Sequence, residues 1–247
     1  MTIRHAIILS AGQGSRLLPL TEDRPKCLID FKGRTLLGWQ IEALRQNGVT
    51  DIAVVTGFKS EMVEAELDRT TDVRARVVFN PFYQVADNLG SLWIARQEMR
   101  DDFIILNGDT LVSPEIVARL IAADGFPITV TVDVKDAYDA DDMKVERHGD
   151  RLVHIGKTLT PEQSNAESIG MLAFRRDGGP RFRREVEDMM RTPAGTSNWY
   201  LRAIDRIAPE GVVGTVSIHG LGWGEVDYPS DLVPAEQLAD KWVREGF

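Results

Sequence analysis

The first part of the chain alternates short apolar runs with amphipathic segments, and this alternation restricts the fold more than any other feature. Such short runs suit strands buried on both faces, and the segments between them carry apolar residues at helical spacing. Strands that alternate with helices join through right-handed crossovers into a largely parallel sheet. The expected strands are 6–9, 52–55, 77–79 and 103–106, and the expected helices are 36–47, 59–68, 89–99 and one beginning at 113–114.

Two of these helices carry clear boundary signals. Gly48 follows the first helix at the position where a left-handed residue commonly ends a helix. Ser113 is a good N-cap residue, and Pro114 after it suits the first helical position. These signals support helices rather than strands between the apolar runs.

The pattern changes after residue 124, where several strand-like runs follow one another with turns between them. We expect strands at 128–134, 143–146, 152–155, 168–174 and 212–218, and helices at 181–191, 199–207 and 232–244. Successive strands without helices predict an antiparallel section added to the same sheet. No repeat, low-complexity segment or linker divides the chain, so residues 1–247 are expected to form a single domain. The fold class is α/β: a Rossmann-like mixed, mainly parallel sheet flanked by helices, with an antiparallel section in the C-terminal half.

The composition excludes several classes of protein. The 29 basic and 38 acidic side chains give a net charge of −9, which disfavours binding to nucleic acid or to an anionic membrane surface. The single cysteine, Cys27, cannot form an internal disulfide or a cysteine-based zinc site. No apolar run reaches the ~20 residues that span a bilayer, and the first residues lead into a strand rather than a signal peptide. We expect a cytoplasmic protein with no nucleic-acid or membrane partner.

A glycine-containing turn follows the first strand. Gly12 and Gly14 suggest a dinucleotide-binding loop, but Leu17 stands where that motif has its third glycine, and no Walker A ending is present. The small residues still let backbone N–H groups approach an anion, with Arg16 and Lys26 nearby to neutralise it. From the glycines alone, an ordinary turn with surface basic residues is the favoured interpretation.

Two acidic segments far apart in the sequence are candidates for a metal site. Asp109 follows the apolar run 103–106, at the carboxyl end of an expected strand where ligands collect in open α/β sheets. Asp227 lies in the segment 222–227, with Glu225 as a second acidic residue there. Two carboxylates from distant segments, completed by substrate oxygens and water, suit Mg²⁺. Taken alone, each aspartate is better interpreted as a turn or helix-cap residue.

The longer motif around the glycine turn resembles the signature of the sugar-phosphate nucleotidyltransferase superfamily. Residues 9–21 read Leu-Ser-Ala-Gly-Gln-Gly-Ser-Arg-Leu-Leu-Pro-Leu-Thr, and residues 24–28 read Arg-Pro-Lys-Cys-Leu. The resemblance implies a fold of the nucleotide-diphospho-sugar transferase type, with residues 1–124 as the nucleotide-binding half and residues 125–247 as the acceptor-binding half. It implies that Leu9, Ala11, Gly12, Gly14, Asn88 and Ser91 contact the nucleotide, that Arg16 and Lys26 hold its phosphates as catalytic residues, and that Asp109 and Asp227 bind Mg²⁺. Read without the resemblance, Asn88 could instead cap the helix it precedes.

Departures from the sugar enzymes indicate the acceptor. Many of them carry Glu-Lys-Pro where residues 156–158 read Gly-Lys-Thr. The segments 23–28, 143–145, 167–170 and 198–200 look more like those of the phosphocholine and aminoalkylphosphonate cytidylyltransferase branch. This branch implies CTP as the nucleotide and an alcohol phosphate or phosphonate such as phosphocholine or 2-aminoethylphosphonate as the acceptor. The expected acceptor-binding residues are Lys144, Lys157 and Glu167, although a lysine in an exposed hairpin is often only solvated. Four aromatic residues could form a cation–π cage for a trimethylammonium group, namely Trp199, Tyr200, Trp223 and Tyr228.

The implied reaction needs no protein nucleophile, because an acceptor phosphate oxygen attacks the α-phosphorus and pyrophosphate leaves. The four histidines are scattered and are interpreted as structural or surface residues. Cytosine is expected to be selected by the backbone carbonyls near 9–11 with the Asn88 amide. Two alternatives stay open: a sugar-1-phosphate nucleotidyltransferase that uses UTP, dTTP or GTP, and a nucleotide-binding regulatory module without catalysis. The sequence also leaves open whether the chain forms a homodimer.

Overall fold

A mixed sheet of nine strands runs through the residues that the computed structural model describes, 3–247. Its strand order is β5-β4-β1-β6-β11-β8-β12-β10-β9, and β11 also pairs with β9. The strands are β1 (His5–Ser10), β4 (Asp51–Thr56), β5 (Arg74–Phe79), β6 (Phe103–Asn107), β8 (Ile128–Asp133), β9 (Lys144–His148), β10 (Arg151–Ile155), β11 (Ala166–Phe174) and β12 (Val213–Ser217).

The strand directions agree with the mixed sheet predicted from the sequence. Strands β5, β4, β1 and β6 are parallel neighbours, as expected for strands joined by helical crossovers. Strand β11 then runs antiparallel to β6 and β8, and the pairs β10–β12 and β9–β10 are also antiparallel. The predicted antiparallel section of the C-terminal half is therefore confirmed.

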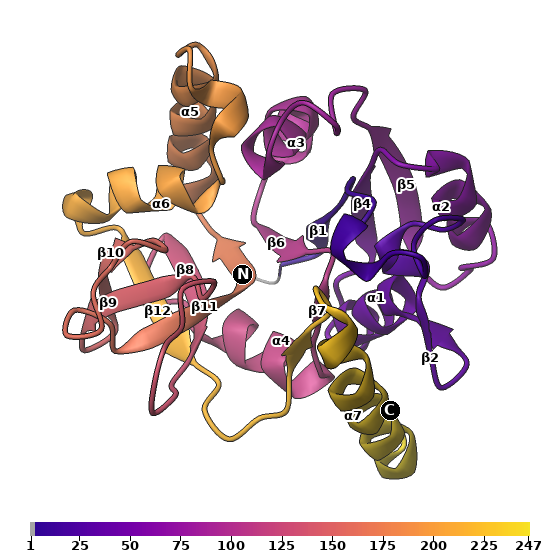
Figure 1. Cartoon of the computed structure of the whole chain (residues 1–247). Helices are drawn as coiled ribbons and strands as arrows, with labels where there is room; N and C mark the ends of the chain where they lie inside the picture. The colour runs from indigo at the N-terminus through magenta and orange to yellow at the C-terminus, as the bar shows by residue number, and fades with distance from the viewer. Residues whose placement is uncertain (1–2) are drawn as a thin grey trace.

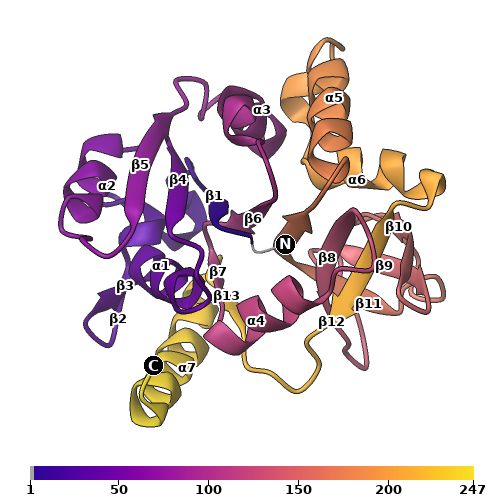
Figure 2. The same ribbon diagram turned by 180° about the vertical axis from the view of Figure 1, so that it is seen from behind.

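Helices cover both faces of the sheet. In Figures 1 and 2, α3 (Asn88–Ile94) and α5 (Gly178–Met190) lie above the sheet, and α1 (Leu36–Gln46) and α4 (Pro114–Ala122) lie below it. Residues of the central strands alternate between the two layers, because successive side chains of a strand point to opposite faces. The remaining helices are α2 (Ser60–Leu67), α6 (Leu201–Ile207) and α7 (Leu232–Glu245).

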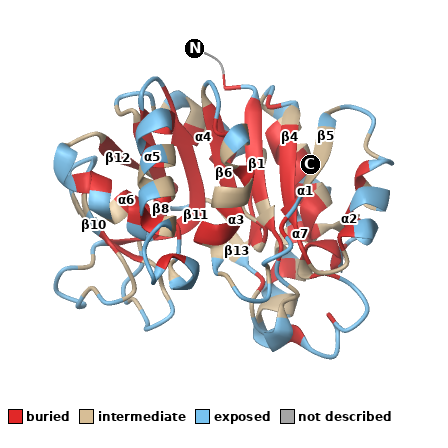
Figure 3. Ribbon diagram, turned by 90° about the horizontal axis from the view of Figure 1, so that it is seen from above, coloured by how far each residue is buried: buried red, intermediate tan, exposed pale blue. Residues whose placement is uncertain are grey.

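The two faces bury separate hydrophobic clusters. Ile7 and Ile105 pack on the side of α3, α5 and α6, whereas Ala6 and Ile104 pack on the side of α1, α2 and α4. Figure 3 shows the central strands as almost wholly buried. This burial on both faces explains why the strands were recognisable as short, nearly continuous apolar runs.

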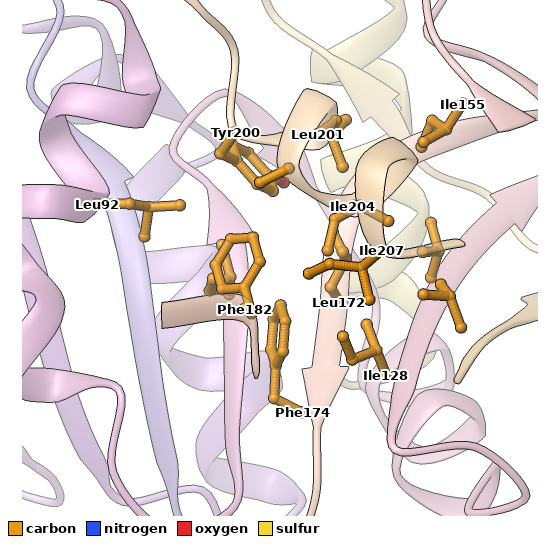
Figure 4. Packing of buried hydrophobic residues seen from close by; sticks show 14 of the residues in the cluster. Leu92, Ile128, Ile155, Leu172, Phe174, Phe182, Tyr200, Leu201, Ile204 and Ile207 are labelled. Atoms are coloured by element: carbon orange, nitrogen blue, oxygen red, sulfur yellow. The ribbon is translucent and has the colours of Figure 1, made fainter. Parts of the chain in front are cut away.

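An aromatic stack fixes α5 and α6 on the upper face (Figure 4). The rings of Phe103 and Phe174 are stacked with centroids 4.7 Å apart, and Phe174 lies 4.7 Å from Phe182. Tyr200, just before α6, meets the edge of Phe182 at 6.4 Å. Such contacts hold the segment that carries Tyr200 firmly against the sheet.

Two very short strand pairs were not predicted from the sequence. Strands β2 (Asp30–Phe31) and β3 (Arg34–Thr35) form one hairpin, and β7 (Thr110–Leu111) pairs with β13 (Gly224–Glu225). The β7–β13 pair joins segments more than a hundred residues apart in the sequence, and α7 packs beside it in Figure 1. This pair matters for the site, because it connects the two acidic segments singled out above.

The helix signals behave as the sequence indicated. Ser113 caps α4 by accepting a hydrogen bond from the N–H of Ile116, with Pro114 at the first helical position. Gly48, beyond the end of α1, has a φ of +77°. Thr35 caps the start of α1 through the N–H of Gly38, a feature the sequence analysis did not identify.

Candidate active site

A cavity of about 640 Å³ opens at one edge of the central sheet. The carboxyl ends of β1 and β6 point to this edge, and β11 begins there because it runs in the opposite direction. Parallel strands present their following loops together at such an edge. Eight of the thirteen site residues expected from the sequence line the cavity: Gly12, Arg16, Lys26, Asn88, Asp109, Lys157, Glu167 and Asp227.

One lysine joins the two predicted metal ligands. The Nζ of Lys26 lies 3.0 Å from an oxygen of Asp109 and 2.6 Å from an oxygen of Asp227. Arg16 adds a contact of 3.3 Å to the other oxygen of Asp227. Burial alone would lower the pKa of Lys26, but the two carboxylates outweigh it and raise the pKa. Likewise burial would raise the pKa of Asp227, and Lys26 lowers it. Lys26 and Asp227 are therefore both charged at neutral pH.

The donor set fits a divalent cation. A single ammonium group contacts both aspartates, so their carboxylates lie close enough to share one positive ion. Carboxylate oxygens are the ligands that Mg²⁺ prefers, usually one or two from the protein, with the remainder from substrate phosphates and water. Residues 3–247 contain no group of three or more His, Cys, Asp and Glu side chains arranged to hold a metal on their own. The arrangement therefore matches a site that a nucleotide completes.

The β7–β13 pair connects the segments that carry the two aspartates. Thr110, next to Asp109, pairs with Glu225, and the N–H of Val226 donates to the carbonyl of Asp109 at 3.0 Å. Glu225 lies in the cavity wall, and its burial, together with the charges of Asp109 and Asp227, raises its pKa to about 8. At neutral pH Glu225 is therefore largely protonated and adds little negative charge to that of the two aspartates.

The glycine loop forms a second wall of the cavity. A side chain at Gly12 would meet no other atom within 4 Å, whereas one at Gly14 would lie 2.9 Å from the Cβ of Lys26. Gly14 also has a φ of +78°, so glycine lets Lys26 pass directly behind the loop. The carbonyls of Leu9 and Ala11 accept hydrogen bonds from the N–H groups of Gly108 and Phe58. Leu9, Ala11 and Gly14 are not among the lining residues, and their contact with a nucleotide remains a prediction.

Asn88 and Ser91 lie at different depths. Asn88 lines the cavity, and its side-chain oxygen accepts a hydrogen bond from the N–H of Tyr200 at 2.9 Å. The interpretation of Asn88 as a helix cap is wrong, because Asp87 precedes α3 at the cap position and Asn88 is its first helical residue. Ser91 is buried, and its hydroxyl accepts a hydrogen bond from the side-chain amide of Asn80 at 3.1 Å. Ser91 is not a lining residue, so nucleotide contact by Ser91 stays a prediction.

A second lysine–carboxylate cluster also lines the cavity. Lys135 Nζ contacts Glu167 at 2.6 Å and Asp142 at 3.2 Å. Glu167 is only 3% exposed, and its second oxygen, Oε1, is buried without a hydrogen-bond partner among residues 3–247. Burial raises the pKa of Glu167 to about 7, although Lys135 favours the charged form. Lys135 and Asp142 were missed from the sequence; the acidic run 139–142 was the available signal.

The two predicted acceptor lysines differ in position. Lys157 lines the cavity, with its Nζ 4.8 Å from the centre of the Trp199 ring and 3.6 Å from Asp141. Lys144 is only 4% exposed, and its Nζ donates to the carbonyl of Lys157 at 2.9 Å. Lys144 therefore supports the segment that carries Lys157, and its contact with an acceptor remains a prediction.

The four aromatic residues of the suggested cage line the cavity, but two are committed to other partners. The hydroxyl of the fully buried Tyr200 donates to the side chain of Asn107 at 3.2 Å, and Trp223 donates to Asp133 at 2.8 Å. Trp199 and Tyr228 are exposed, and protein cations already lie over both rings: Lys157 over Trp199 and Arg16 over Tyr228.

The chain belongs to the family described as the MobA-like NTP transferase domain, whose profile matches residues 6–174, more than half of the sequence. It is 27% identical to the CTP:phosphoglutamine cytidylyltransferase of Campylobacter jejuni, in an alignment that covers 92% of this chain and 97% of that protein. It is also 30% identical to the CMP-5'-(3-aminopropyl)phosphonate synthase of Streptomyces rubellomurinus, over 94% of this chain and 38% of that protein.

Solved structures agree on the fold. The inositol-1-phosphate CTP transferase of T. maritima superposes with a TM-score of 0.82 at 24% identity, covering 98% of this chain and 96% of that one. The Rossmann-like nucleotidyltransferase fold expected from the sequence is thereby confirmed. In the part of the chain that the structure describes, no helix has the length and hydropathy needed to cross a membrane.

Proposed function

We propose that the protein transfers CMP from CTP to a phosphate or phosphonate oxygen of a small acceptor that carries an ammonium group. The observation that carries the proposal is one cavity lined both by two aspartates with Arg16 and Lys26 and by a second lysine–carboxylate cluster, that of Lys135. The first cluster suits a triphosphate with its cation. The second suits a smaller, partly cationic ligand.

The relatives support cytidine as the base. The two named above are a CTP-dependent cytidylyltransferase of a phosphorylated amino acid and a synthase of a CMP aminoalkylphosphonate. Selection of cytosine requires hydrogen-bonding groups that would be left unpaired by another base. Asn88 is a lining residue of this kind, with its side-chain oxygen held by Tyr200.

The reaction assigns distinct roles to the residues. An acceptor oxygen attacks the α-phosphorus of the nucleotide, the bond from that phosphorus to the bridging oxygen breaks, and pyrophosphate leaves with that oxygen. Arg16 is half exposed on the loop and can follow the phosphates, and Lys26 neutralises charge near the aspartates. Mg²⁺ held by Asp109 and Asp227 would supply further charge neutralisation and orient the triphosphate. Catalysis then consists of positioning and electrostatic stabilisation, without a covalent enzyme intermediate.

The acceptor end favours a cation beside the phosphate. Asp142 and Glu167 already bind one primary ammonium, that of Lys135, and Asp139 and Asp141 add further negative charge to the wall. The free Oε1 of Glu167 can accept another N–H group. Lys157 supplies a cation for the acceptor phosphate.

The test is a screen of pyrophosphate release with CTP, UTP, dTTP, ATP and GTP, each against phosphocholine, 2-aminoethylphosphonate and glucose 1-phosphate. We expect turnover with CTP and one of the two acceptors that carry an ammonium group, phosphocholine or 2-aminoethylphosphonate. This turnover should be lost in excess EDTA. Highest activity with UTP, dTTP or GTP and glucose 1-phosphate would instead assign the protein to the sugar enzymes. A Glu167→Gln variant should raise KM for the amino acceptor while leaving KM for CTP unchanged.

A further inference from the structure

A buried glutamine lies directly beneath the loop that carries Asp109. Gln40, in α1, has no exposed surface, and its Nε2 donates to the carbonyl of Asn107 at 2.7 Å and to the carbonyl of Thr110 at 2.8 Å. These two carbonyls belong to the residues that bracket Gly108 and Asp109. One side-chain amide therefore fixes both ends of the turn between β6 and β7.

The chemistry of Gln40 does not fit a role in packing alone. Its Oε1 is buried and has no hydrogen-bond partner among residues 3–247. A buried polar atom without a partner costs free energy, so an apolar residue of similar size would serve a purely structural purpose better. What an apolar residue cannot supply is the pair of N–H donors directed at the two carbonyls.

The turn is also restrained from other directions. The N–H of Gly108 donates to the carbonyl of Leu9, and the Thr110 hydroxyl donates to the carbonyl of Ile169 at 3.2 Å. A side chain at Gly108 would lie 2.4 Å from the carbonyl oxygen of Leu9, so the turn packs tightly against β1. Gln40 supplies the restraint from the side of α1.

The turn that Gln40 holds is also connected to the segment that carries Asp227. Thr110 pairs with Glu225, and the carbonyl of Asp109 accepts the N–H of Val226. A shift of the turn would therefore move Asp109 relative to Asp227. We propose that Gln40 is a positioning residue that sets the separation of these two carboxylates; this role rests on the proposed function, in which they bind the metal.

The test compares two amides of the same helix segment. Gln40→Met keeps the volume and removes both donors. The control is Asn47→Leu: Asn47, which ends α1, also bridges two backbone carbonyls, those of Ala43 and Pro114, both at 2.9 Å, away from the cavity. Mn²⁺ binding is measured from the loss of the free-ion EPR signal, first with the protein alone and then with CTP but no acceptor.

Substitution of a residue that orients metal ligands typically weakens metal affinity about 10- to 100-fold. We expect a loss of this size for Gln40→Met and an unchanged affinity for Asn47→Leu, even where both variants lose thermal stability. Gln40→Asn retains the amide on a side chain that is one methylene shorter, and this variant should bind Mn²⁺ with intermediate affinity. If Gln40→Met does not fold, the affinity of Gln40→Asn tests the role of Gln40 instead.

The outcomes separate the two assignments. Wild-type affinity in Gln40→Met, or in a folded Gln40→Asn when the former does not fold, overturns the role of Gln40 and leaves the metal site standing. An equal loss in Asn47→Leu also overturns it, because the effect would then be one of general destabilisation. If the wild-type protein binds no Mn²⁺ in either condition, the metal assignment fails and the role of Gln40 fails with it.

Discussion

The buried carboxyl group of Glu167 makes the stability of the protein depend on pH in a defined window. Burial raises its pKa from 4.5 to about 7, against the opposing effect of Lys135. Between these values the folded protein holds a proton that the unfolded chain releases, so the contribution of Glu167 to the free energy of unfolding falls as the pH rises. At about 1.36 kcal/mol for each pKa unit, the whole shift corresponds to about 3 kcal/mol.

Glu167→Gln removes this titration while it keeps the size of the side chain. The free energy of unfolding of the variant minus that of the wild type should therefore increase with pH, by about 2.5 kcal/mol between about pH 5 and about pH 8. The remainder falls below this range. Glu225, with a pKa of about 8, titrates in both proteins, and the charge of Glu167 makes only one of the smaller contributions to that pKa, so most of the difference between the proteins comes from Glu167.

Urea unfolding at several pH values, followed through the fluorescence of the five tryptophans, measures this difference. Glu61→Gln is the control, because Glu61 is exposed on α2 and its replacement should stay within about 0.5 kcal/mol at every pH. A difference between Glu167→Gln and wild type that changes by less than about 1 kcal/mol across this pH range would refute the reasoning.

Three further predictions concern catalysis. Asp109→Ala and Asp227→Ala should each abolish metal-dependent turnover while circular dichroism shows a folded protein, and appreciable activity in the double variant would exclude a role for both. Lys26→Ala should lower kcat/KM by more than about 100-fold. Because the Lys26 side chain is only 15% exposed and lies between two carboxylates, this substitution should also lower the free energy of unfolding by more than the ~0.5 kcal/mol typical of a surface lysine. Near-normal kcat/KM in this variant would contradict the phosphate role. CTP should give a higher kcat/KM than UTP, dTTP, ATP or GTP, and an equal rate with UTP would rule out the expected recognition of the cytosine amine.

The framework of the fold could be predicted because each central strand is buried on both faces. The run 103–106 became β6, Phe103–Asn107, and 52–55 became β4, Asp51–Thr56, with ends moved by a residue or two. The positions of the glycine loop and of Asp109 could be predicted as well, because both follow parallel strands and the carboxyl ends of such strands meet at one edge of the sheet. These inferences need only local pattern and the general geometry of parallel sheets.

The sequence could not reveal features that arise from contacts between distant segments. Strands β7 and β13 have two residues each, too few to show any period, and they exist because Thr110 and Glu225 meet across the fold. Lys144 has the sequence surroundings of an exposed hairpin lysine, yet it is buried and bonded to the carbonyl of Lys157. Lys135 became noticeable only once Glu167, more than thirty residues away in the sequence, was seen beside it.

The two lysine–carboxylate clusters explain how an acidic protein can bind anionic substrates. With a net charge of −9, the molecule as a whole repels a triphosphate, so attraction must come from local cations within about a Debye length. Two aspartates hold Lys26 in position. When Lys26 binds the phosphates of the nucleotide instead, the negative charge of these aspartates favours a divalent cation in its place. In the second cluster Asp142 and Glu167 hold Lys135 in the same manner. An acceptor with its own ammonium group adds little net charge to this cluster, whereas a sugar phosphate adds negative charge beside two carboxylates and brings no cation to offset it. From the charge balance of the cavity we therefore expect a preference for a zwitterionic acceptor over glucose 1-phosphate.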